Sequence, residues 1–223
     1  MRIGVLSDTH VGDVLPVLPP EALSALTGVD LIIHAGDVVL AGTLARLREV
    51  APVVAVQGNH DRKGGLQLPR AATVRAGEHR IGVIHGDQPR LRELPAAIAS
   101  LAAGRVLTLG HESRLVRELD APDVLVFGHL HVPVRRHIGR TLVFSPGSVY
   151  LSNRDSEYRP SGPVQRGTEW FRSRLPTDAR EPAIGIIDVA PGRIDISRVP
   201  LSQPLRPMTA EQRGRAVRSP AHG

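Results

Sequence analysis

Residues 2–10, RIGVLSDTH, join a short apolar run to a polar ending that contains Asp8 and His10. The apolar run is typical of a buried strand. The same pattern returns at residues 31–37, LIIHAGD, where the run ends in Asp37. Strands that end in carboxylates and imidazoles, with helix-like residues between them, predict an α/β fold whose ligand site lies at the strand ends.

The alternation extends along the chain. In the first half we expect strands at residues 2–6, 31–35 and 53–56 and helices at 21–26 and 40–50. Farther along we expect strands at 73–75, 81–84, 124–127, 134–138, 141–144, 184–189 and 194–199, and helices at 91–103 and 112–119. A parallel first half should therefore precede a second half richer in antiparallel pairs.

Two segments interrupt this pattern. Residues 153–182 are rich in Arg, Ser, Pro and Gly, carry the sole tryptophan, Trp170, and are interpreted as a long loop or lid. Residues 202–223 lack apolar periodicity and are expected to form a flexible C-terminal tail. The predicted organisation is a single domain over residues 1–201, followed by this tail.

Composition excludes several classes of protein. The 223 residues include no cysteine, which excludes disulfides, zinc–thiolate sites and cysteine nucleophiles. No apolar run approaches the ~20 residues of a membrane span, and the N-terminus lacks a signal-peptide core, so we expect a cytoplasmic protein. The net charge of +6 comes from arginines spread along the chain, and only 3% of residues are aromatic, so nucleic-acid binding is disfavoured.

Five polar segments lie at or just after expected strand ends. They are Asp8-Thr9-His10, Gly36-Asp37, Gly58-Asn59-His60-Asp61, His85-Gly86-Asp87 and Gly128-His129-Leu130-His131. They supply seven candidate metal ligands: Asp8, His10, Asp37, Asn59, His85, His129 and His131. Seven ligands suit two ions ~3.5–4 Å apart that share a bridge. Nitrogen and oxygen donors without sulfur favour Mn²⁺, Fe, Ni²⁺, Co²⁺ or Zn²⁺, and the net positive charge of two such ions favours an anionic substrate such as a phosphate ester.

In this order the segments resemble the signature of the calcineurin-like metallophosphoesterases: D-x-H, G-D, G-N-H-[DE], a lone His often followed by Gly, and G-H-x-H. The short chain and the SPGS turn at residues 145–148 are similar to the compact bacterial and archaeal phosphodiesterase branch, which also includes a non-catalytic retromer subunit. The resemblance covers residues 1–199. It implies a four-layer α/β/β/α sandwich of two mixed β-sheets flanked by helices.

The resemblance also implies a role for each residue. Asp8, His10 and His131 would bind one divalent ion, Asn59, His85 and His129 the other, and Asp37 would bridge them, with Mn²⁺ as the favoured metal. His60 would be the catalytic acid, oriented by Asp61, and Asn59, His60 and His129 would contact the substrate phosphate. The implied reaction is hydrolysis of a phosphate ester, first of all a phosphodiester, by attack of a metal-bridging hydroxide.

Three alternatives stay open at this point, and the least favoured is a nuclease, which only the positive charge supports. A phosphomonoesterase, including a protein phosphatase, would use the same seven ligands, and a non-catalytic metal-binding scaffold would be marked by degraded ligands, of which the sequence shows none. The expected substrate is a small-molecule phosphate ester or a nucleotide, and assembly into a homo-oligomer is compatible with the sequence. Beside the motifs, His34 is expected to support the site, Asp87 is a candidate partner for His85, and Arg62 is expected to be solvated.

Overall fold

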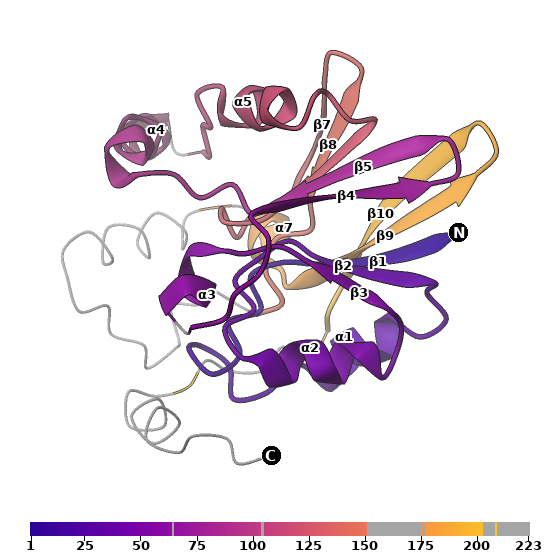
Figure 1. The fold of residues 1–223 in the computed structure, drawn as a ribbon. Coiled ribbons are helices and arrows are strands. Elements are labelled where there is room, and N and C mark those ends of the chain that lie inside the picture. The colour runs from indigo at the N-terminus through magenta and orange to yellow at the C-terminus, as the bar shows by residue number, and fades with distance from the viewer. Residues whose placement is uncertain (64, 104, 151–174, 176, 203–207, 209–223) are drawn as a thin grey trace.

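The apolar runs of the sequence form strands that assemble into two five-stranded sheets (Figure 1). The computed structural model describes residues 1–63, 65–103, 105–150, 175, 177–202 and 208. The strands are β1 (Arg2–Leu6), β2 (Leu31–His34), β3 (Val53–Ala55), β4 (Ala71–Ala76), β5 (His79–Ile84), β6 (Val124–Phe127), β7 (Val134–Ile138), β8 (Thr141–Ser145), β9 (Ala183–Ala190) and β10 (Arg193–Pro200). The helices are α1 (Pro20–Ala25), α2 (Ala41–Arg48), α3 (Asn59–Lys63), α4 (Arg90–Ala103), α5 (His111–Glu118) and α7 (Thr177–Arg180).

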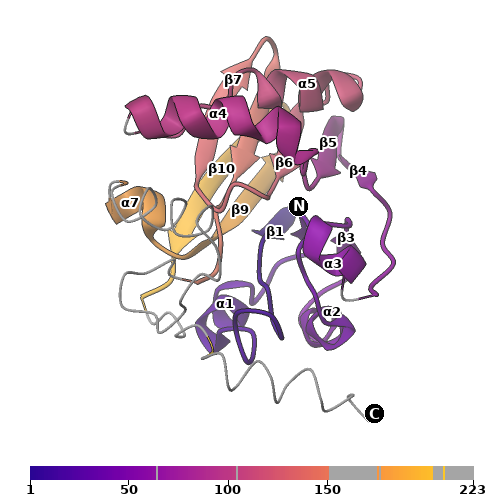
Figure 2. The ribbon, with the colours of Figure 1, turned by 90° about the vertical axis from the view of Figure 1, so that its left-hand side faces the viewer.

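Each sheet mixes parallel and antiparallel neighbours. The first has the order β10-β9-β1-β2-β3, with β1, β2 and β3 parallel, β9 antiparallel to β1, and β10 antiparallel to β9. The second has the order β4-β5-β6-β8-β7, with β5, β6 and β8 parallel and an antiparallel strand at each edge. Figures 1 and 2 show α1 and α2 along the first sheet and α4 and α5 along the second. The predicted four-layer sandwich is confirmed.

Successive side chains of a strand point to opposite faces of its sheet, and those that point toward the other sheet form the core between the two sheets. Ile3 and Val5 of β1 are fully buried there and pack in one cluster with Val126 and Phe144 of the second sheet. A side chain on Gly185 would collide with this packing, because its Cβ would lie 2.4 Å from Phe144 Cε1. Burial of each large apolar side chain contributes about 1.5–3 kcal/mol, so this interior fixes how the sheets face each other.

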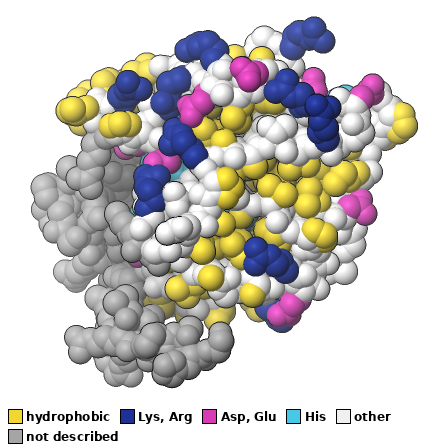
Figure 3. Space-filling view, in the orientation of Figure 1, with side chains coloured by type: hydrophobic (Ala, Val, Ile, Leu, Met, Phe, Trp, Pro, Cys, Tyr) yellow, Lys and Arg dark blue, Asp and Glu magenta, His cyan; other side chains and the backbone are white. Residues whose placement is uncertain are grey.

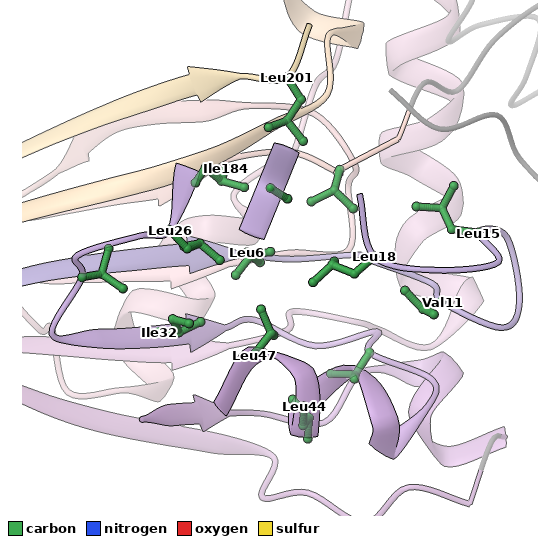
Figure 4. Packing of buried hydrophobic residues seen from close by; sticks show 14 of the residues in the cluster. Leu6, Val11, Leu15, Leu18, Leu26, Ile32, Leu44, Leu47, Ile184 and Leu201 are labelled. Carbon is green, nitrogen blue, oxygen red and sulfur yellow. The ribbon is translucent and has the colours of Figure 1, made fainter. Parts of the chain in front are cut away.

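The opposite faces of the sheets bury their side chains under helices. The side chains of Leu6 and Ile32 lie on the face of the first sheet that is turned away from the second sheet. They pack with Leu26, just after α1, and with Leu47 of α2 (Figure 4). On the second sheet, apolar side chains of β6 and α5 form the matching outer layer. The two outer cores hold the strand ends in place, and those ends carry the polar segments.

Each expected strand and helix is found within two residues of its bounds, and α7, inside the expected lid, is an additional helix. Two further differences concern the kind of structure formed. Residues 59–63 form helix α3, where the sequence suggested a loop, and the Asp61 carboxylate closes its first turn by accepting the Gly58 N–H at 2.7 Å. The centre of the second sheet is parallel, because the connection through α4 and α5 brings β6 back beside β5 in the same direction. In this sheet the antiparallel pairs, β4 with β5 and β7 with β8, lie at the two edges.

The expected lid and tail fall largely outside the described residues. Of residues 153–182, the structure describes Leu175 and residues 177–182, which contain α7; Trp170 lies outside. In the tail, the Ser202 N–H donates to Glu21 Oε1 at 2.9 Å, and the N–H of buried Met208 donates to the Val14 carbonyl at 2.6 Å. The lid and the flexible tail therefore stay predictions.

Among the described helices, none combines the length and the apolar character needed to cross a bilayer. On the face shown in Figure 3, basic side chains stand among acidic ones. This mixture agrees with the spread of arginines along the sequence.

Candidate metal centre

The carboxyl ends of strands from both sheets meet at one edge of the sandwich. Strands β1, β2 and β3 are followed by Asp8, Asp37 and Asn59, and β5 and β6 are followed by His85 and His129. The His129 N–H joins the two sheets here, because it lies 3.0 and 3.1 Å from the two Asp8 carboxylate oxygens. Asp8, Asp37 and His85 are at most 1% exposed. Polar groups this deeply buried need partners, so the edge is built to pair charges.

Most of the predicted ligands stand on an unusual backbone. The angle φ is positive at Asp8 (52°), His10 (46°), Asp37 (56°), His129 (71°) and His131 (56°). A non-glycine residue in this region costs about 1–3 kcal/mol, and such strain concentrates at functional sites. The strain is therefore an independent sign that this edge was selected for function.

Two glycines of the motifs make room for the ligand side chains. A Cβ on Gly36, whose φ is +91°, would lie 2.6 Å from His85 Nδ1. A Cβ on Gly58 would lie 2.2 Å from Asp37 Oδ1. Contacts this short are forbidden, so each motif needs glycine for the close approach of ligand and backbone.

Four of the predicted ligands form one compact group. Donor atoms of Asp8, His10, Asp37 and His131 all lie within 4.8 Å of one another. His10 Nε2 is 3.3 Å from both His131 Nε2 and Asp37 Oδ2, and His131 Nε2 is 3.4 Å from Asp8 Oδ1. Atoms that are each about 2.0–2.2 Å from one ion are separated by about this distance, so the group fits a divalent cation.

The other predicted ligands gather around His85. His85 Nε2 lies 3.3 Å from Asn59 Oδ1 and 3.3 Å from Asp37 Oδ2, and the ring centroids of His85 and His129 are 5.3 Å apart. Asp37 Oδ2 is thus 3.3 Å from a ring nitrogen of each group, His10 Nε2 on one side and His85 Nε2 on the other. One carboxylate oxygen therefore lies between the two donor groups, and both groups consist of the nitrogen and oxygen donors that divalent cations accept.

The buried acidic and basic side chains at this edge have shifted pKa values. Burial raises the pKa of Asp8. Burial also acts to raise the pKa of Asp37, but the hydrogen bond with His85 and the nearby imidazoles outweigh it and hold that pKa well below its usual range. For His85, burial opposes the charged ring, yet the carboxylates of Asp37 and Asp8 raise its pKa to about 9. The Asp37 carboxylate and the His85 imidazole therefore favour each other's charged forms.

His60 lies at the outer side of the first group, and its partner differs from the expectation. Its ring Nδ1 is 2.5 Å from Asp13 Oδ2, its ring packs edge-on against His10 at 4.5 Å, and its side chain is 34% exposed. Asp61 instead accepts backbone N–H groups from Asp37 (3.0 Å) and Val39 (2.7 Å) as well as from Gly58. The prediction that Asp61 orients the His60 ring is therefore corrected. Asp13 takes that place, and Asp61 shapes the loops that carry the ligands.

The residues beside the motifs also find definite partners. Asp87 pairs with Arg62 at 2.6 Å, so Arg62 is not simply solvated, while the His85 Nδ1–H donates to the Ala35 carbonyl at 2.8 Å. Buried His34 contacts Thr9 Oγ1 at 3.1 Å, in line with a supporting role. Sequence reasoning missed Asp13, Tyr150 (2.9 Å from His131 Nδ1) and Glu93 (2.7 Å from His129 Nε2), which lie outside every motif.

His111, outside the motifs, gives a stability prediction. Burial, together with the Arg114 charge, lowers its pKa from 6.5 to about 4. Between those values the unfolded chain binds a proton that the native protein excludes, so the free energy of unfolding should fall as pH drops from 6.5 to 4, by at most about 3 kcal/mol at 1.36 kcal/mol per unit. Urea unfolding of metal-free protein across this range measures it. In His111→Gln this part of the slope should disappear, and equal slopes in both proteins would contradict the assignment.

Comparison with known proteins agrees with this geometry. The family model of the calcineurin-like phosphoesterase superfamily domain matches residues 1–159. A probable metallophosphoesterase of Methanothermobacter thermautotrophicus is 38% identical over 149 residues, covering 66% of this chain and 77% of the relative. One of Methanocaldococcus jannaschii is 39% identical over 150 residues, covering 66% and 68%.

Solved structures share the fold at lower identity. Vps29 of Entamoeba histolytica in complex with Zn²⁺ superposes with a TM-score of 0.58 at 20% identity, covering 90% of this chain and 99% of that one. A structure described as a novel archaeal phosphodiesterase gives a TM-score of 0.50 at 20% identity, covering 89% and 100%. These structures show that the chain has the metallophosphoesterase fold. The chain belongs to the calcineurin-like phosphoesterase superfamily.

Proposed function

We propose that this protein hydrolyses phosphate esters, phosphodiesters in particular, with two divalent metal ions bound at the strand ends. The observation that carries the proposal is the place of Asp37 Oδ2, 3.3 Å from a ring nitrogen in each donor group. Asp8, His10 and His131 would hold one ion, and Asn59, His85 and His129 the other, with Asp37 shared. Mn²⁺ is the preferred metal, and Fe, Ni²⁺, Co²⁺ and Zn²⁺ accept the same donors.

The chain's own groups divide the remaining work. When bound, the ions would supply Lewis-acid stabilisation of the phosphate and lower the pKa of a water molecule. Asp8 and Asp37 supply the negative charge that holds the cations. Asn59, His60 and His129 stand at the rim of the centre, where they would orient the phosphate oxygens.

His60 is proposed to protonate the leaving group. Asp13 holds its Nδ1, so the proton would pass from Nε2 to the departing oxygen. A carboxylate on Nδ1 fixes the tautomer and the orientation of a histidine that acts as an acid or base. The backbone N–H of His60 also donates to Asp37 Oδ1 at 2.8 Å, which ties the acid to the bridging residue.

The preference for diesters is supported by the resemblance to the compact phosphodiesterase branch, and one fold neighbour is described as a phosphodiesterase. Chelated protein should be inactive and regain activity with Mn²⁺, with a higher kcat/KM on bis(4-nitrophenyl) phosphate than on 4-nitrophenyl phosphate. The variant His137→Ala, at an exposed histidine on β7, is the matched control and should behave like wild type. A preference for the monoester would assign a phosphomonoesterase, and full activity of metal-free protein would contradict metal dependence.

A further inference from the structure

Helix α4 brings to the metal centre a carboxylate that belongs to no motif. Glu93 Oε1 lies 2.7 Å from His129 Nε2 and also accepts the backbone N–H of Gln88 at 3.2 Å. The Glu93 side chain is 34% exposed and the His129 side chain 20% exposed. The carboxylate is thus fixed at two points, with the imidazole on one side.

The other three histidines of the centre show what such a partner does. Each points Nε2 toward the donor groups. Two of them have a hydrogen-bond partner at Nδ1, the Ala35 carbonyl at 2.8 Å for His85 and the Tyr150 hydroxyl at 2.9 Å for His131. The Nδ1 of His10 lies 3.5 Å from Asp13 Oδ2 without a hydrogen bond. A metal-binding imidazole usually donates its second N–H to an acceptor of this kind, which sets the tautomer and the ring orientation. In His129 the acceptor lies at Nε2 instead, which leaves Nδ1 as the ring nitrogen that could face an ion.

The backbone explains this exchange. The His129 N–H lies 3.0 Å from Asp8 Oδ1, so the main chain of His129 already touches the centre. From such a place Nδ1, the ring nitrogen closer to the main chain, can reach an ion, and Nε2 points away from it. The outward Nε2–H then needs an acceptor, which Glu93 supplies.

We propose that Glu93 is a positioning residue of the metal centre. It accepts the His129 Nε2–H and so fixes His129 as the tautomer whose Nδ1 carries the lone pair. This tautomer would bind more tightly the ion that His129 shares with Asn59 and His85. This inference rests on the proposed function. It also gives α4 a purpose in the site, since the family motifs place no residue on this helix.

The test compares Glu93→Ala and Glu93→Gln with Arg92→Ala, an exposed residue of the same helical turn. Chelated proteins are titrated with Mn²⁺ and with Zn²⁺, and binding is followed calorimetrically. Glu93→Ala should lower the affinity for one of the two ions by about 10–100-fold and leave the affinity for the other unchanged. Glu93→Gln should lose less, because its amide oxygen still accepts the Nε2–H, and Arg92→Ala should match wild type.

A spectroscopic readout tests the tautomer directly. In the Zn²⁺-loaded wild type with ¹⁵N-labelled histidine, NMR should show His129 protonated on Nε2 and metal-bound through Nδ1. Unchanged binding of both ions in Glu93→Ala would overturn the proposal. An equal loss in Glu93→Gln and Glu93→Ala would also overturn it, because Glu93 would then act through its charge and not as the acceptor of the Nε2–H. A metal ion bound to His129 Nε2 would overturn it too, because Nε2 would then have no proton to donate to Glu93. If wild type bound fewer than two ions, the two-metal function itself would fail.

Discussion

Asp37→Ala is expected to leave the protein folded but to remove both metal ions and nearly all activity. Asp37 Oδ2 is the atom that lies between the two donor groups, 3.3 Å from His10 Nε2 and 3.3 Å from His85 Nε2. Without it, each group loses a ligand, and the buried imidazoles lose the anion that balances a cation. Metal ions stabilise a transition state by several kcal/mol, and each 1.36 kcal/mol is tenfold in rate, so the loss should be at least about 10³-fold.

The experiment needs elemental analysis and a folding control alongside kinetics. Asp37→Asn keeps the size of the side chain and an acceptor for the His60 N–H, and removes only the charge, so it should lose metal with less disturbance of the fold. Asp195→Ala, at an exposed residue of β10, should retain both ions. Circular dichroism should show the same secondary structure in all three. Two metal ions per chain in Asp37→Ala would refute the bridging assignment.

Much of the fold could be read from the sequence because its strands are short apolar runs that end at turns. Residues 2–6 and 124–127 form β1 and β6 at the expected bounds. Sheet membership was harder to derive, because pairing depends on contacts between distant segments. The parallel centre of the second sheet arises from a crossover of some forty residues, and no local pattern encodes its direction.

The site likewise has a part that the sequence predicts and a part that only the tertiary structure shows. Its ligands follow strands directly, so spacing alone predicts that they meet. Their partners come from elsewhere: Asp13 from the turn after β1, Glu93 from α4 and Tyr150 from the segment after β8. A single carboxylate or hydroxyl on a turn or a helix carries no pattern, and only the tertiary structure brings it to an imidazole. The pairing of His60 with Asp13 in place of Asp61 is the clearest case.

His60→Asn should separate substrates by their leaving groups. A general acid contributes about 10²–10⁴-fold when the departing oxygen is a strong base and much less when it is a weak one. Diesters that release an alkyl or nucleoside alkoxide should therefore slow by about that factor, while 4-nitrophenyl esters should slow far less. Metal content should stay at the wild-type value, because His60 is not among the proposed ligands. Measurement of kcat on both substrate types decides the role.

Asp13→Asn tests the same acid from the other side of the ring. The Asp13 carboxylate is 2.5 Å from His60 Nδ1, the proposed acid, and lies 3.5 Å from Nδ1 of His10, a proposed metal ligand. If it orients the acid, Asp13→Asn should repeat the leaving-group dependence of His60→Asn in weaker form, and the double variant should be no slower than His60→Asn alone. Equal losses on both substrates in His60→Asn would instead mean that His60 only holds the phosphate. Additive losses in the double variant would show that Asp13 acts through His10, because only an effect independent of the His60 ring survives its removal.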